Sequence, residues 1–198
     1  DEAMEIGDRT IALARQLNEP HIEATAHFFN WGQFWAGRMD EAQVHADACR
    51  ALGERLGIPY LIASAAHAVG ALASARGDWD EASRIFELGL EASPMDQRLI
   101  GQSCAVAAQR GDIDLANSLF HRLIDAVAKV PPGPGLEWTT LSNVAVRIAH
   151  ISGRAPDLEL IRRASQAVLA SPVPGTVMFK GYVYHALALL AHMTNDKT

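Results

Sequence analysis

A short signature recurs along this chain at intervals of forty and thirty-four residues. It reads GDWDEA at Gly77–Ala82, GRMDEA at Gly37–Ala42 and, more loosely, GDIDLA at Gly111–Ala116. The chain also begins with Asp-Glu-Ala. Recurrence at such a period is typical of one structural unit stacked on itself, so the repeat constrains the fold more than any other feature of the sequence.

The residues around the signature predict a pair of helices joined by a tight turn. Apolar residues recur at i, i+3 and i+4 from Leu61 to Ala73, before the signature, and again from Ala82 to Leu90, after it. Gly77 suits the left-handed conformation that ends a helix. Either Asp78 or Asp80 can then cap the second helix.

The same pattern extends over the whole chain. Residues 1–20 align with residues 40–59, so residue 1 begins the second helix of a pair. A degenerate fourth copy follows Gly153, where Pro156 suits the first helical position and Asp157 the first turn. No segment has a strand pattern, and the proline-rich stretches 130–135 and 171–175 read as loops within one solenoid. We expect roughly nine helices and a last one that raises the number to ten, over about 1–17, 21–36, 39–57, 60–75, 79–92, 96–110, 113–129, 137–152, 156–170 and 175–193.

These units resemble the tetratricopeptide repeat. The matching residues in the best unit are Gly70, Gly77, Ala82, Phe86, Gly89 and Pro94, and those in the next unit are Gly111, Ala116 and Phe120. The chain departs from the family where Ala66 and Ala73 replace its aromatic residues, and where two of the spacings are near forty instead of thirty-four. The resemblance implies an all-α fold, a right-handed α-solenoid of antiparallel helix pairs that forms one domain over residues 1–198.

Two further features are similar to the sensor arrays of LuxR- and MalT-type bacterial signal-transduction ATPases and of related adenylate cyclases. They are the GRMDEA turn and the helix end Leu56–Pro59 (LGIP). This resemblance implies a non-catalytic protein-interaction or ligand-sensing module of a bacterial signalling or transcriptional regulator. A stand-alone scaffold protein, and the regulatory tail of a cyclase-type enzyme, remain as alternatives.

Composition and charge limit the classes of partner that the chain is expected to bind. The net charge is −6, and no basic run is present, so the sequence argues against direct nucleic-acid binding. No apolar run is long enough to span a membrane, and the acidic start differs from a signal peptide. Cys49 and Cys104 lie in apolar segments and read as buried thiols. We therefore expect a cytoplasmic protein and, because the chain begins within a repeat and without methionine, a fragment of a longer one.

The aromatic segment at residues 27–35 (HFFNWGQFW) is the main candidate for a binding site. Phe28, Trp31 and Trp35 share one face of the expected helix, and together with His67 they are the predicted residues of a groove for a protein, a peptide or a small-molecule effector. Packing between helices is the alternative explanation for these rings.

Catalytic and metal-binding signals are weak. The eight histidines include no HExxH spacing, and no phosphate loop, dinucleotide fingerprint or nucleophile elbow is present. We therefore expect no catalytic residues, metal site or cofactor. The last helix is unusually apolar around Tyr182 and Tyr184. We expect this apolar face to be covered, either by a further helix of the intact protein or by a second copy of the chain in a homodimer.

Overall fold

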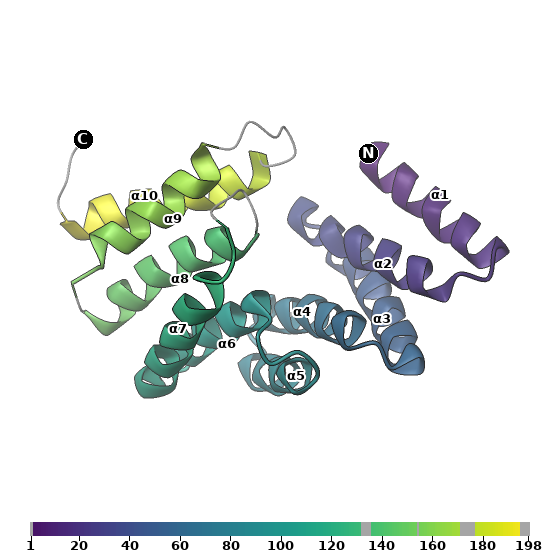
Figure 1. Cartoon of the computed structure of the whole chain (residues 1–198), viewed down its shortest axis with the longest axis horizontal. Coiled ribbons are helices and arrows are strands. Elements are labelled where there is room, and N and C mark those ends of the chain that lie inside the picture. Colours follow the sequence, from purple (N-terminus) through teal and green to yellow (C-terminus); the bar gives the residue numbers. More distant parts are fainter. Residues whose placement is uncertain (1, 132–135, 154, 171–176, 195–198) are drawn as a thin grey trace. The chain divides into compact units, whose positions relative to one another are not determined.

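The computed structural model describes residues 2–131, 136–153, 155–170 and 177–194. Within these ranges the regular elements are ten α-helices and one 3₁₀-helix, without a strand (Figure 1). The all-α prediction is therefore confirmed, whereas most of the two predicted proline-rich loops lies outside the described residues. The helices are α1 (Glu2–Gln16), α2 (Pro20–Asn30), α3 (Met39–Leu56), α4 (Pro59–Ala75), α5 (Trp79–Ala92), α6 (Gln97–Gln109), α7 (Ile113–Val127), α8 (Leu136–Ser152), α9 (Leu158–Leu169) and α10 (Val177–Thr194), with the 3₁₀-helix η1 at Trp31–Ala36.

The chain divides into two compact units. Unit 1 is Asp1–Pro94 and contains α1 to α5 with η1, and unit 2 is Met95–Thr198 and contains α6 to α10. In each unit, helices that follow one another in sequence pack together, and so do some alternate helices, such as α2 with α4 and α8 with α10. The single repeat domain expected over residues 1–198 stays a prediction.

The signature turns have one backbone geometry. Gly37, Gly77 and Gly111 have φ angles of 77°, 82° and 81°, in the left-handed region that a residue without Cβ adopts at low cost. In each turn the N–H after the glycine donates to the carbonyl five residues earlier, which satisfies an otherwise unpaired group at the helix end. These bonds run from Arg38 to Gln33 (3.1 Å), from Asp78 to Ala73 (3.0 Å) and from Asp112 to Ala107 (3.0 Å).

The aspartate after the glycine caps the next helix in two of the three copies. The Asp78 carboxylate accepts from the N–H of Glu81 at 3.3 Å, and Asp112 accepts from the N–H of Leu115 at 3.1 Å. Asp78, and not Asp80, is thus the cap of α5. At the Gly37 turn the same position holds Arg38, which provides no side-chain cap.

The degenerate fourth copy differs from the prediction. Asp157 is itself the N-cap of α9, since its carboxylate accepts from the N–H of Leu160 at 2.9 Å. The helix therefore begins at Leu158, and Pro156 lies before the cap instead of at the first helical position. The start of this helix is therefore set by the capping side chain, which satisfies a free N–H. The fixed φ angle of the proline does not set it.

Small residues let the helices of unit 1 approach closely. Ala82 is fully buried, and so is Ala42 at the equivalent position of α3. The ring of Phe86 on α5 lies against Gly70 on α4, where an added Cβ would be 2.2 Å from the Cε1 of the ring. Leu61 to Ala73 of α4 are almost all buried, which fits a helix packed by neighbours on several sides.

One predicted helix is divided. The segment expected as a helix over 21–36 is α-helical to Asn30 and then winds as the 3₁₀-helix η1. Tighter winding brings residues i and i+3 over one another, and the rings of Trp31 and Phe34 accordingly lie 5.3 Å apart between centroids. Gly32 has low α-helix propensity, so this change of winding costs little there. The prediction of one continuous helix was wrong at this point.

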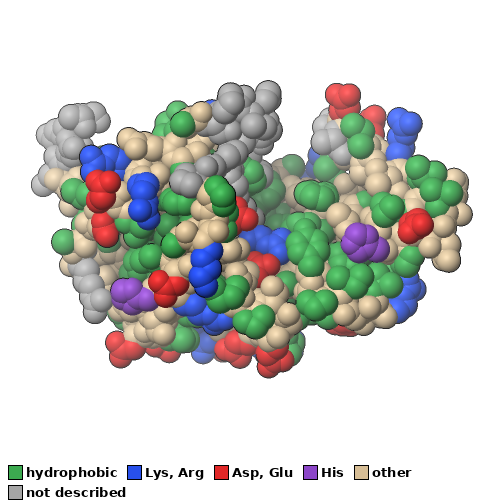
Figure 2. All heavy atoms as spheres, in the orientation of Figure 1, with side chains coloured by type: hydrophobic (Ala, Val, Ile, Leu, Met, Phe, Trp, Pro, Cys, Tyr) green, Lys and Arg blue, Asp and Glu red, His purple; other side chains and the backbone are tan. Residues whose placement is uncertain are grey.

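No helix in the described part of the chain has both the length and the apolarity to cross a membrane. Figure 2 shows one face of the molecule, on which hydrophobic side chains reach the surface among charged ones.

Candidate binding surface

Aromatic rings of α2, η1 and α4 form one cluster in unit 1. Trp31 lies at its centre, with ring centroids 5.7 Å from Trp35 and 5.5 Å from His67, the latter edge-on. Phe28 lies 6.4 Å from His67. The four residues that the sequence singles out are therefore brought together, although His67 comes from a helix more than thirty residues away.

The four residues differ in how much of their surface is accessible. Trp31 and His67 are buried, Phe28 is half-buried, and Trp35 is 43% exposed. Trp31 and His67 can therefore support a binding surface but present little area to a partner. Whether the cluster is a groove for a ligand stays a prediction.

Phe29 extends the accessible part of the cluster. Its side chain is 70% exposed, and its ring lies 5.7 Å from that of Phe28 in an edge-to-face arrangement. Phe34 packs edge-on against Trp35 at 4.6 Å. Large rings held against a buried base, with an accessible edge, are the kind of residue that anchors protein interfaces. The sequence analysis did not select Phe29, because a continuous helix turns it away from the face of Phe28 and Trp31.

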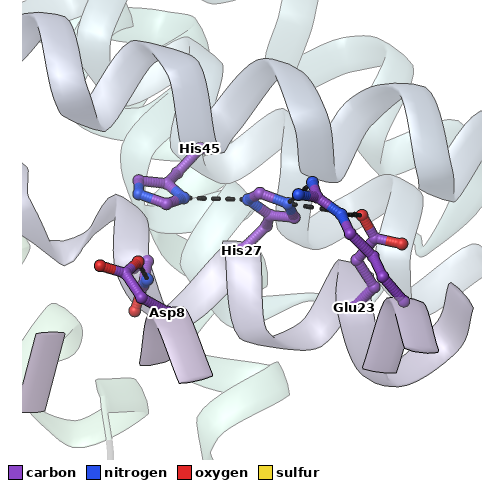
Figure 3. A network of polar contacts seen from close by, with 6 residues as sticks. Asp8, Glu23, His27 and His45 are labelled. Carbon is purple, nitrogen blue, oxygen red and sulfur yellow. Dashed lines mark hydrogen bonds and ion pairs between the residues drawn. The ribbon is translucent and has the colours of Figure 1, made fainter. Parts of the chain in front are cut away.

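Figure 3 shows a polar network around His27, the residue that precedes Phe28 of the aromatic cluster. The Nδ1 atoms of His27 on α2 and His45 on α3 are 2.9 Å apart, within hydrogen-bonding distance. Arg15 on α1 approaches the Nε2 of His27 at 3.4 Å, and its own Nε donates to Glu23 at 2.6 Å. Glu23 also lies 3.8 Å from the Nε2 of His27. The network therefore joins α1, α2 and α3.

The donors in this network determine where the imidazole protons lie. Arginine has no acceptor, so the Nε2 of His27 must accept from Arg15. The proton of His27 is then on Nδ1, from which it donates to the Nδ1 of His45. His45 in turn carries its proton on Nε2. Both rings are neutral in this arrangement, and each bond has one donor and one acceptor.

The surroundings favour the neutral rings. Burial, with smaller contributions from His45 and Arg15, lowers the pKa of His27 to about 4, although Glu23 and Asp8 oppose this shift. Burial also lowers the pKa of His45. Desolvation disfavours the imidazolium form, and the Arg15 guanidinium repels it. The pair is consequently a neutral structural contact near pH 7.

A second polar contact links α1 to the end of α2. The side-chain amide of the buried Asn30 donates to Asp8 at 2.9 Å. Gly7 makes room for it, since a Cβ there would be 1.8 Å from the Oδ1 of Asn30. This contact ties α1 to the residue at which the α-helix changes into the 3₁₀-helix.

Sequence reasoning missed the His27–His45 pair because it compared histidine spacings only within one helix. The two histidines come from different helices, and only the packing of α2 on α3 joins them. Within the described residues, no group of three or more His, Cys, Asp or Glu side chains could hold a metal ion.

The cysteines show no sign of catalytic activation. Both are fully buried, and the thiol of Cys104 donates to the carbonyl of Ala116 at 3.1 Å. Burial raises the pKa of Cys104 to about 12, whereas a nucleophilic cysteine has a lowered pKa. The thiol acts here as a small apolar side chain in the contact between α6 and α7.

Comparison with known proteins identifies no relative. No protein-family model matches the chain, and neither a curated protein nor a solved structure matches it. The likeness to the tetratricopeptide repeat therefore rests on the residues quoted from the sequence.

Proposed function

We propose that this chain is a right-handed solenoid of antiparallel helix pairs that acts as a non-catalytic protein-interaction or ligand-sensing module. By its resemblance to the sensor arrays, we place it in a bacterial signalling or transcriptional regulator. The repeated turn geometry and the packing of successive and alternate helices within each unit support the solenoid. The exposed part of the aromatic cluster is the observation that carries the proposed function.

The partner is a peptide segment with an apolar or aromatic side chain that packs against Phe29 and Trp35. Both rings are already held in place by neighbours, so little side-chain entropy is lost on binding. Trp35 belongs to η1, which packs on α3. A ligand that prefers one arrangement of η1 shifts the population of this unit, which is the minimum that a sensor requires.

Peptide selection tests this function with a matched tryptophan control. Peptides selected by phage display on the 198-residue chain are measured against a Phe29→Ala/Trp35→Ala double variant. The control is Trp79→Ala, because Trp79 on α5 is 39% exposed, close to the 43% of Trp35. We expect the double variant to weaken peptide binding at least tenfold and the control to leave it within twofold.

The function is wrong if peptides bind the double variant as well as the native chain while its circular dichroism is unchanged. Trp31→Ala is a poor test, since removal of a buried aromatic side chain costs roughly 3–5 kcal/mol and perturbs the whole cluster.

A second surface for association lies on α10. Tyr184 is 61% exposed there, although Val183 and Ala186 are buried. We include a homodimer through this helix in the proposal. Sedimentation of the native chain and of Tyr184→Glu tests it, with a dimer expected only for the native chain.

A further inference from the structure

Unit 2 contains a pocket that is separate from the aromatic cluster. The pocket has a volume of about 240 Å³ and is lined by residues of α6, α8 and α10. Its buried residues are apolar and include Ala108, Val144 and Ile148. Ligand sites usually combine such an apolar base with a few polar groups. Roughly 300–1,000 Å³ is typical for drug-sized ligands, so this pocket suits a smaller molecule.

The polar side chains at the pocket are the amide of Gln109 on α6 and three nitrogen donors on α8 and α10. Arg147 and His150 lie three residues apart on one side of α8, and His185 reaches the pocket from α10. All three side chains are exposed. A more open depression adjoins this pocket, shares His150 with it and adds His192.

The three donors have no partner within the part of the chain that the structure describes. Neither Arg147 nor the two histidines make a hydrogen bond or an ion pair there. Other arginines are paired with carboxylates, for example Arg84 with Glu81 and Arg98 with Asp96. Arg147 is thus available for an external acceptor.

Acidic residues are absent from the lining of both depressions. Across the sequences of α6, α8 and α10, the one acidic residue is Glu137, ten positions before Arg147. Ten residues of α-helix span about 15 Å, so Glu137 does not neutralise the pocket. Arg147 is therefore a cation without an acidic neighbour in either lining, in a chain whose net charge is −6.

We propose that this pocket binds a small organic anion, whose carboxylate or phosphate head is held by Arg147 with His150 and His185 and whose apolar part packs on Ala108, Val144 and Ile148. The planar guanidinium fork matches two oxygens of either headgroup. Each imidazole supplies a ring N–H donor even when neutral. The site goes beyond the function proposed above, because it lies in unit 2 and does not involve the aromatic cluster.

Three probes define the chemistry. Calorimetric titration of the 198-residue chain with 3-phenylpropionate, phenyl phosphate and the neutral 3-phenylpropanamide separates the charge from the apolar group. We expect both anions to bind at least tenfold more tightly than the amide, and their affinity to fall as NaCl rises from 20 to 200 mM. The ratio of the two anion affinities decides between a carboxylate and a phosphate headgroup.

Substitutions locate the site. Arg147→Gln is expected to weaken anion binding at least tenfold, and Arg147→Lys less, because lysine keeps the charge but loses the fork. His185→Gln should weaken binding by a smaller factor. Arg162→Gln is the control, since Arg162 is exposed on α9 and pairs with Glu159 outside the pocket. Circular dichroism checks that each variant is folded.

Four results would overturn the proposal. The first is equal binding of the amide and the acid, and the second is an anion affinity that Arg147→Gln and His185→Gln leave unchanged. The third is the absence of heat and of chemical-shift change at residues 147, 150 and 185 at the highest anion concentration used. Loss of binding in Arg162→Gln as well would assign the effect to overall charge and would also contradict this site.

Discussion

The Nδ1 atoms of His27 and His45 lie 2.9 Å apart across the contact between α2 and α3. Because the Nε2 of His27 accepts from Arg15, the N–H of this contact belongs to His27. A proton added to the pair is poorly accommodated, although the Glu23 carboxylate lies 3.8 Å from the Nε2 of His27. On the Nε2 of His27 it faces Arg15, and on the Nδ1 of His45 it faces another N–H. Asp8 and Glu23 are the nearby acidic groups, and they offset this cost only in part.

Acid should therefore destabilise unit 1. The pKa of His27 falls from 6.5 in the unfolded chain to about 4 in the folded one. The contribution of the neutral His27 ring to the free energy of unfolding is thus fully present above pH 6.5. This contribution is lost as the pH falls toward 4. At about 1.4 kcal/mol per unit, the loss is on the order of 3 kcal/mol. Urea unfolding followed by tryptophan fluorescence measures it, since Trp31, Trp35 and Trp79 lie in unit 1.

His27→Gln isolates this effect, because glutamine donates and accepts without titrating. We expect the variant to show a shallower loss of stability between pH 6.5 and 4 than the native chain. His21→Gln, an exposed histidine on the same helix, should behave like the native chain. Parallel pH curves for His27→Gln and the native chain would contradict the interpretation.

Because Gly70 lies against the ring of Phe86, a larger residue at position 70 should overpack the core. Gly70→Ala places a Cβ within 2.2 Å of a fully buried ring, and overpacking of this kind costs about 1–3 kcal/mol. This exceeds the gain of roughly 1 kcal/mol that alanine brings to a helix. Gly181→Ala on α10 is the control, since its Cβ would meet no atom within 4 Å and should stabilise the helix. Urea unfolding compares the two, and destabilisation by both would show that packing is not the cause.

The two aspartates of the third signature have different roles. Asp112→Ala removes the cap of α7 and should destabilise the protein by about 1 kcal/mol. Asp114 lies in the first turn and interacts only with the helix dipole, so Asp114→Ala should cost at most a few tenths of a kcal/mol. Thermal unfolding of both variants checks this order, and equal effects would argue against the cap.

Neither cysteine should react with a thiol reagent in the native protein. Cys49 and Cys104 are both fully buried, and the thiolate of Cys104 is further disfavoured by a pKa of about 12. At pH 8, Ellman's reagent should modify them only at the rate of unfolding, and both at once in guanidinium chloride. Rapid modification of one thiol in the native state would show that its helix pair opens readily.

Local sequence was sufficient for most helix boundaries and for the signature turns. The left-handed glycine at Gly77 and the cap at Asp78 depend on atoms within a few residues of each other, so they follow from the residue types at those positions. The boundaries at α9 and η1 were predicted less well: the Asp157 carboxylate caps α9 one residue after Pro156, and the expected helix changes its winding after Asn30.

The sequence by itself determined that the chain is helical and where its signature turns lie. Tertiary structure decided which rings of the aromatic segment are covered, paired His27 with His45, and placed Arg147 and His185 at one pocket. The physical reason is that helical periodicity gives the direction of a side chain on its own helix. The neighbours of that side chain on other helices depend on how the helices cross and in which register they pack. That arrangement is set by many weak contacts along the whole length of the helices.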